Sequence, residues 1–94
     1  RSEPRRSSET LAQAPREIVL VGSTVDLAVD RVEKFLNEAM LADERRVRLI
    51  HGRGTGRLRE GLHEFLEEHP LVASVERASP DEGGDAATIV LLRD

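Results

Sequence analysis

Short aliphatic segments alternate with amphipathic ones along this chain, and that alternation limits the fold more than any other feature. Residues 18–21 form a continuous β-branched and aliphatic run that ends in glycine, which is typical of a strand buried on both faces. Residues 25–40 place apolar side chains every three or four positions, which predicts a helix capped by Ser23 or Thr24. Residues 45–50 then form a second strand.

The second half of the chain continues this pattern and closes with a hairpin. Apolar positions in residues 58–66 mark a second amphipathic helix, which Pro70 ends. Residues 71–78 and 87–92 are expected to form strands, joined by a turn at residues 79–85. The order is βαβαββ, so we expect an α/β two-layer sandwich. It would hold two helices and a four-stranded mixed sheet in which helical crossovers join parallel strands.

The first sixteen residues differ in composition from the rest. Residues 1–16 hold two prolines, three serines and four arginines, so we expect a disordered linker or tail there and one folded domain at 17–94. Because the chain begins with Arg1 rather than methionine, we expect it to be part of a longer protein. The absence of cysteine excludes disulfides and thiolate metal sites. No segment resembles a membrane span or a signal peptide, so we expect a cytoplasmic protein without a membrane partner.

The net charge of −4 hides an uneven distribution. Residues 45–59 carry six arginines and no acid, whereas the rest of residues 17–94 carries a charge of −12. An acidic, aromatic-poor chain is on average a weak candidate for nucleic-acid binding, but this basic segment suits a polyanion. The alternative is that the arginines solvate a surface and pair with nearby glutamates. The six are Arg45, Arg46, Arg48, Arg53, Arg57 and Arg59.

Three glycines alternate between the second strand and the second helix, at Gly52, Gly54 and Gly56. Glycine permits positive φ and lets a ligand approach the backbone, and the N–H groups at a helix N-terminus attract anions. Arg53 and Arg57 add guanidinium groups suited to phosphate. The P-loop and the dinucleotide-binding Gly-x-Gly-x-x-Gly patterns are both absent, so nothing here indicates a nucleoside triphosphate. A tight turn that needs glycine for steric reasons alone is the alternative.

One of the three histidines opens this loop. His51 follows the strand beside arginines, where an imidazole could exchange protons at about pH 7; a packing or hydrogen-bonding role is the alternative. His63 and His69 are expected to be surface or capping residues. The histidines do not follow a metal-ligand spacing, so we predict no metal-binding residues, while a divalent cation stays open as a cofactor.

Residues 51–59, HGRGTGRLR, resemble the HGxGTGxLR signature of the Smr (small MutS-related) domain. Later segments match that family in order: HPLV at residues 69–72, then GGD at 83–85 before TIV at 88–90. The likeness covers about residues 17–94. Within this family, the chain most resembles the C-terminal Smr domain of bacterial MutS proteins of the second type.

The resemblance implies a fold similar to the C-terminal domain of translation initiation factor three. It also implies an endonuclease activity, the nicking of DNA, with DNA, branched DNA included, as the partner. The parent protein would carry an upstream ATPase and act in DNA repair and the suppression of homologous recombination. The alternative is a non-catalytic module of the same parent that binds DNA, RNA or the ribosome, as in the rescue of collided ribosomes.

Under the nuclease hypothesis, the glycine loop holds the scissile phosphate. His51 would transfer a proton and Arg53 would stabilise developing negative charge, which makes these two the predicted catalytic residues. The predicted contacts to nucleic acid or phosphate are Gly52, Arg53, Gly54, Thr55, Gly56, Arg57 and Arg59.

The first strand departs from the family pattern. The family carries an LDLR or LDLH segment there, whereas this chain has Val19 at the acid position and Val21 at the Arg or His position. Another acid would then have to serve, with Glu17, Asp26 and Glu60 as the candidates. The two valines favour the binding-module hypothesis.

A third hypothesis is a protein-interaction domain. Glu64, Glu67 and Glu68 on the second helix could meet a basic partner such as a ribosomal protein. A solvated helix face is the alternative explanation of these acids.

Overall fold

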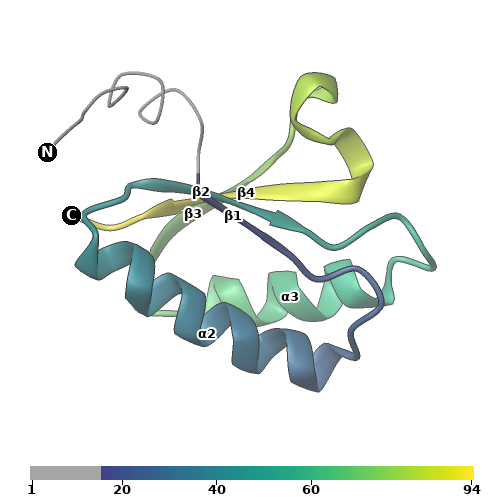
Figure 1. Cartoon of the computed structure of the whole chain (residues 1–94), viewed down its shortest axis with the longest axis horizontal. Coiled ribbons are helices and arrows are strands. Elements are labelled where there is room, and N and C mark those ends of the chain that lie inside the picture. Colours follow the sequence, from purple (N-terminus) through teal and green to yellow (C-terminus); the bar gives the residue numbers. More distant parts are fainter. Residues whose placement is uncertain (1–15) are drawn as a thin grey trace, which may run out of the picture.

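The computed structural model describes residues 16–94, so the expected linker lies outside the described residues except for Arg16, which begins the first strand. The elements follow the predicted βαβαββ order (Figure 1). They are β1 (Arg16–Val19), α2 (Val25–Leu41), β2 (Arg46–Ile50), α3 (Arg57–Glu67), β3 (Val72–Arg77) and β4 (Ala87–Leu92). No helix among residues 16–94 has the length and apolar character that crossing a membrane requires.

The four strands form one mixed sheet in the order β1-β2-β4-β3. β1 and β2 are parallel, and β4 is antiparallel to both of its neighbours, β2 and β3. The final hairpin is therefore confirmed, whereas β2 and β3 run in the same direction without being neighbours because β4 lies between them. Both helices cover the same face of the sheet, which gives the two expected layers (Figure 1).

β1 differs from its prediction in position and in burial. It begins at Arg16 and ends at Val19, two residues before the predicted bounds of 18–21. The expectation of burial on both faces is wrong, because the helices cover only one face. Leu20 points to that face and is fully buried, while Val19 and Val21 are 53% and 61% exposed.

The apolar core lies between the sheet and the two helices, and it confirms the predicted helical stripes. Each fully buried aliphatic side chain there contributes roughly 1.5–3 kcal/mol relative to an exposed one. Of the two candidate caps, Thr24 serves α2, since its hydroxyl accepts a hydrogen bond from the Leu27 N–H at 3.2 Å. The fully buried core residues include Leu20, Val32, Leu36, Val47, Leu49, Leu62, Leu66 and Val90.

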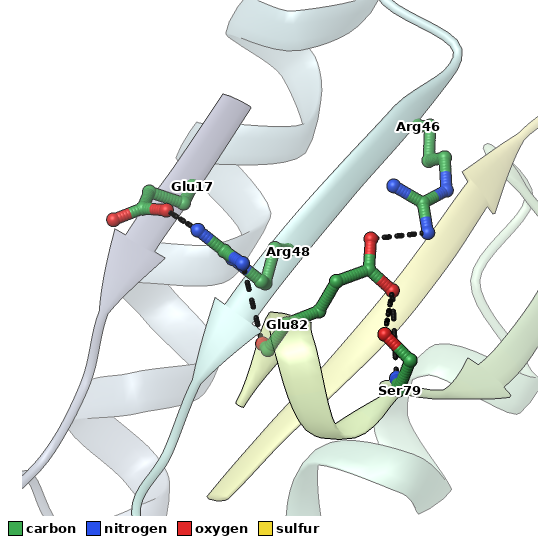
Figure 2. A network of polar contacts seen from close by, with 5 residues as sticks. All are labelled: Glu17, Arg46, Arg48, Ser79 and Glu82. Carbon is green, nitrogen blue, oxygen red and sulfur yellow. Dashed lines mark hydrogen bonds and ion pairs between the residues drawn. The ribbon is translucent and has the colours of Figure 1, made fainter. Parts of the chain in front are cut away.

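The helix-free face of the sheet is partly covered by the segment between β3 and β4. This segment, predicted as a turn, forms two short 3₁₀ helices, η1 (Pro80–Glu82) and η2 (Gly84–Ala86). Figure 2 shows how it is held: the Glu82 carboxylate accepts a hydrogen bond from Arg46 at 2.6 Å, and the Glu82 carbonyl accepts one from Arg48 at 3.2 Å. Ser79 caps the same turn through the Glu82 carboxylate (Figure 2).

His69 is buried, which corrects its assignment to the surface, although it does cap a turn. Its Nδ1 accepts a hydrogen bond from the Leu71 N–H at 3.1 Å, and its Nε2 lies 2.7 Å from Oε1 of Glu33. Because Nδ1 is an acceptor here, Nε2 carries the proton and donates to the carboxylate. His69 thus joins α2 to the segment between α3 and β3.

The stability of the fold in acid should depend on the contact between the Glu33 carboxylate and His69. Its hydrogen bonds from His69 and, second, Asn37 hold the pKa of Glu33 below its ordinary value. The ionised form therefore stabilises the fold above the unfolded-state pKa, and that contribution is lost as pH falls through the folded-state pKa. Glu33→Gln keeps an acceptor for His69 but cannot ionise. We expect E33Q to be less stable than the wild type at neutral pH and this difference to shrink below about pH 4.

Urea unfolding at several pH values measures this effect. Glu38→Gln, on the same helix and also exposed, is the control and should change little. A difference between E33Q and the wild type that stays constant from neutral to acid pH would contradict the linkage.

Gly61 of α3 lies directly against Val25 of α2. A Cβ atom at this position would lie 2.6 Å from Cγ1 of Val25, in the first turn of α2. Val25 is β-branched and has few rotamers with which to move away. The glycine therefore sets the distance between the N-terminal part of α2 and α3.

Gly61→Ala should destabilise the protein by about 1 kcal/mol, because the overlap with Val25 outweighs the usual gain in helix propensity. Val25→Ala removes the overlapping atoms, so Gly61→Ala in that background should be neutral or stabilising. Denaturant unfolding of the four proteins in this cycle measures the coupling between the two positions. A more stable Gly61→Ala single variant would refute the steric explanation.

Candidate functional site

A cleft of about 560 Å³ opens at the carboxyl end of the two parallel strands. Two segments line it: residues 21–26, which follow β1 and include the first two residues of α2, and residues 51–59, which follow β2 and include the first three residues of α3. Since parallel strands end at the same edge of a sheet, the pairing of β1 with β2 brings these two segments together. Every residue predicted to contact phosphate lines this cleft.

The loop glycines adopt backbone conformations that other residues rarely take. Gly52, Gly54 and Gly56 have φ of 82°, 41° and 87°. Gly56 is the N-cap of α3 and has no side chain with which to cap the helix. The neighbouring Thr55 hydroxyl accepts a hydrogen bond from the Arg57 N–H at 3.3 Å. The glycines thus meet a steric need. α3 begins at the cleft, and within residues 16–94 Thr55 is the side chain that accepts a hydrogen bond from its first turn.

The six-arginine segment divides into two groups of three. The first group lies on β2 or just before it and is neutralised by carboxylates: Arg45 pairs with Asp43 and Asp94, Arg46 with Glu82, and Arg48 with Glu17. The second group, Arg53, Arg57 and Arg59, lines the cleft and forms no ion pair with another residue of 16–94. Pairing therefore removes half of the local charge and leaves the remainder beside the glycines.

His51 is only 5% exposed, and both of its ring nitrogens have partners inside the protein. Nδ1 lies 2.8 Å from the Gly52 carbonyl, and Nε2 lies 2.9 Å from Oγ1 of Thr88. The backbone N–H groups of His51 and Gly52 both donate to the Ala86 carbonyl, at 3.0 and 2.9 Å. The first two residues of the loop are thus bonded to the last residue of η2, directly before β4.

Thr88 and His63 are neighbours of this site that the sequence analysis missed. Thr88 is 2% exposed, and its hydroxyl also lies 3.2 Å from Nε2 of His63 on α3. Burial, followed by the nearby Arg59 and His51, lowers the pKa of His63 below its ordinary value. His63 is half-buried: it lines a groove beside α3, and the sequence analysis missed its contact with Thr88. The available signal was a single hydroxyl within the otherwise apolar strand segment ATIVLL.

Of the three alternative acids, only Asp26 lines the cleft. Glu17 pairs with Arg48 on the helix-free face of the sheet (Figure 2). Glu60 lines a neighbouring groove beside α3, together with His63 and the helix acids Glu64 and Glu67. Within residues 16–94, no three His, Asp or Glu side chains are grouped so that they could hold a metal ion.

The two valines of the first strand take different positions. Val21 lines the cleft, and its side chain lies 3.3 Å from the point where a Cβ of residue 52 would be. Val19 is the last residue of β1 and is exposed but does not line the cleft, whereas Val21 follows that strand. An apolar side chain therefore stands beside the loop where the family pattern has Arg or His.

The Smr domain family model matches residues 18–93. Relatives named Endonuclease MutS2 include that of Thermomicrobium roseum, 45% identical over 89 residues that cover 95% of this chain and 11% of that protein. The Geobacillus kaustophilus relative is 43% identical over 82 residues that cover 87% of this chain and 10% of that protein. The chain thus spans about a tenth of the length of these relatives.

Two solved structures share the fold. The crystal structure of the Smr domain of Thermus thermophilus MutS2 aligns with a TM-score of 0.81 and 40% identity, covering 84% of this chain and 99% of that one. The stand-alone small MutS-related protein YdaL from Escherichia coli aligns with a TM-score of 0.77 and 27% identity, covering 83% and 64%. Together with the family match and the HGRGTGRLR loop around the cleft, these similarities establish that the chain belongs to the Smr domain family.

Proposed function

We propose that this domain binds the phosphodiester backbone of nucleic acid in the cleft and nicks DNA there. As part of a larger MutS-like ATPase, it would act in DNA repair and in the suppression of homologous recombination. The observation that carries the proposal is that three arginines without an ion-pair partner among residues 16–94 meet the glycine loop at one cleft. The name Endonuclease MutS2, which the relatives bear, supports the same reaction class.

The chemistry of the cleft suits a phosphate more than a base. Arg53 and Arg57 are exposed and offer bidentate donors. Among residues 16–94, no protein acceptor takes the backbone N–H groups of residues 53–55, which leaves these three available to an anion. The two aromatic rings, Phe35 and Phe65, pack in or against the core and provide no stacking surface. We therefore infer recognition of the backbone and its shape rather than of sequence.

Hydrolysis would break the bond between phosphorus and one sugar oxygen while water supplies the new oxygen. Negative charge grows on the phosphoryl oxygens as water attacks, and Arg53, which lines the cleft, would stabilise it. The water needs a proton acceptor, and Asp26 is the carboxylate that lines the cleft. A divalent cation could support the same step.

A non-catalytic binding module is the second candidate function. Val19 and Val21, exposed at the positions where the family carries an acid and Arg or His, favour it. Such a module would use the same arginines to bind branched DNA, structured RNA or the ribosome without cleaving.

The arginines should determine how strongly binding depends on salt. Arg53→Ala combined with Arg57→Ala should lower the slope of log affinity against log salt by about 2 and weaken binding to all sequences alike. Fluorescence anisotropy with a labelled duplex, a four-way junction and an RNA hairpin, each over a salt series, measures this and ranks the three partners. Arg45→Ala is the control, because Arg45 precedes β2 and already pairs with Asp94. Equal weakening in Arg45→Ala would show that overall charge, not the cleft, binds nucleic acid.

A substitution of Asp26 should reduce the cleavage of DNA without weakening its binding. Asp26→Asn should reduce nicking of supercoiled plasmid by about 100-fold while the affinity for DNA is kept or rises. Glu60→Gln, which changes an acid in the first turn of the other helix, should leave nicking unchanged. Parallel reactions with magnesium and with a chelator test whether nicking requires a divalent cation. Undiminished nicking in Asp26→Asn would exclude Asp26, and salt-sensitive binding without nicking by the wild type would select the second candidate function.

A further inference from the structure

We propose that Thr88 and His63 are positioning residues that hold His51, and through it the glycine loop, in its phosphate-binding geometry. The inference deepens the proposed function and rests on it for the role of the loop. A continuous chain of hydrogen bonds, from α3 through β4 to the cleft, carries the proposal.

The donors and acceptors in this chain can be assigned from their partners. The Gly52 carbonyl can only accept, so Nδ1 of His51 carries a proton and donates at 2.8 Å. On a ring with one proton, Nε2 is then an acceptor, and the Thr88 hydroxyl donates to it at 2.9 Å. A hydroxyl has a single proton, so the second contact of Thr88, at 3.2 Å, must be donated by Nε2 of His63. Each polar atom in the chain is then satisfied by one arrangement of protons.

The burial of Thr88 makes this arrangement energetically important. Its side chain is 2% exposed, within a strand whose other residues are Ala, Ile, Val and Leu. An unpaired hydroxyl there would cost roughly 1–3 kcal/mol, whereas valine has nearly the same shape and no polar group to satisfy. Thr88 thus places a hydroxyl at a position where valine would pack equally well. The two partners of this hydroxyl are both histidines of this site.

The chain of hydrogen bonds ends at Gly52, the second residue of the loop. The Gly52 carbonyl is held by His51, the Gly52 N–H is held by the Ala86 carbonyl at 2.9 Å, and Val21 packs beside its Cα. The orientation of the next peptide groups, residues 53–56, depends on how Gly52 is held. Thr88 and His63 therefore set the direction of the N–H groups and arginines that would bind phosphate.

This arrangement changes the role expected for His51. Its Nδ1 proton is committed to the Gly52 carbonyl, and its Nε2 faces Thr88 inside the protein. Donation of the Nδ1 proton to a substrate, or acceptance of a proton from it at Nε2, would break a contact that holds the loop. His51 is thus a positioning residue, and the reacting groups of the cleft are the arginines and Asp26.

Nitrogen-15 NMR of the histidine rings and loop amides tests the proposal without relying on activity. The wild type should show His51 as the Nδ1–H tautomer. Thr88→Val should remove that signature and shift the amide signals of residues 53–56, and Thr88→Ser, which keeps the hydroxyl, should restore both. His63→Leu should act like Thr88→Val, while His63→Gln keeps a donor for Thr88 and should resemble the wild type.

His69→Gln is the matched control, because His69 is also a buried, hydrogen-bonded histidine but lies away from the cleft. It should change thermal stability without moving the loop amides, which separates positioning from general destabilisation. Affinity for duplex DNA should fall about tenfold in Thr88→Val and His63→Leu only.

Three outcomes bear on the proposal. An Nε2–H tautomer of His51, or unchanged loop amides in Thr88→Val, would overturn it. Loop shifts of equal size in His69→Gln would also overturn it, since they would reflect loss of stability alone. A wild type that binds no nucleic acid would refute the proposed function, while the tautomer and the amide shifts would still decide whether Thr88 and His63 position the loop.

Discussion

The parallel pairing of β1 with β2 is the constraint on which the rest of this structure depends. Parallel neighbours need a crossover, which α2 supplies, and they end at the same edge of the sheet. The segments that follow the two strands therefore meet, together with the N-termini of α2 and α3. Gly61 allows the helices to approach closely behind that edge. The cleft is a consequence of topology before any particular side chain is considered.

Charge in the domain is arranged by pairing as much as by composition. Half of the arginines between residues 45 and 59 form ion pairs with carboxylates. These are Asp94, Glu82 in the 79–86 segment and Glu17 on β1. The other half lies in the cleft, where the loop backbone also offers donors. A net charge of −4 then coexists with a locally positive site, because potential near a surface follows the nearest unpaired charges.

The position of the loop that lines the cleft could be predicted from the sequence, since glycine spacing, the strand end and the helix start are local signals. The burial of the His51 ring could not, because the same residue at a strand end can face solvent or the interior. Thr88 is separated from His51 by 37 residues and from His63 by 25, and no local pattern joins them. Only the insertion of β4 beside β2 brings its hydroxyl between the two rings.

The sequence by itself determined the order of the elements, the position of the glycine loop and membership of the family. It could do so because hydrophobic periodicity, turn glycines and the HGRGTGRLR segment are all read along the chain. The tertiary structure decided that helices cover one face of the sheet, so that Val19 and Val21 are exposed. It also decided which arginines pair with carboxylates of residues 16–94 and where the His51 ring points. These properties depend on partners distant in sequence, whose burial and hydrogen bonds exist only once the strands have paired.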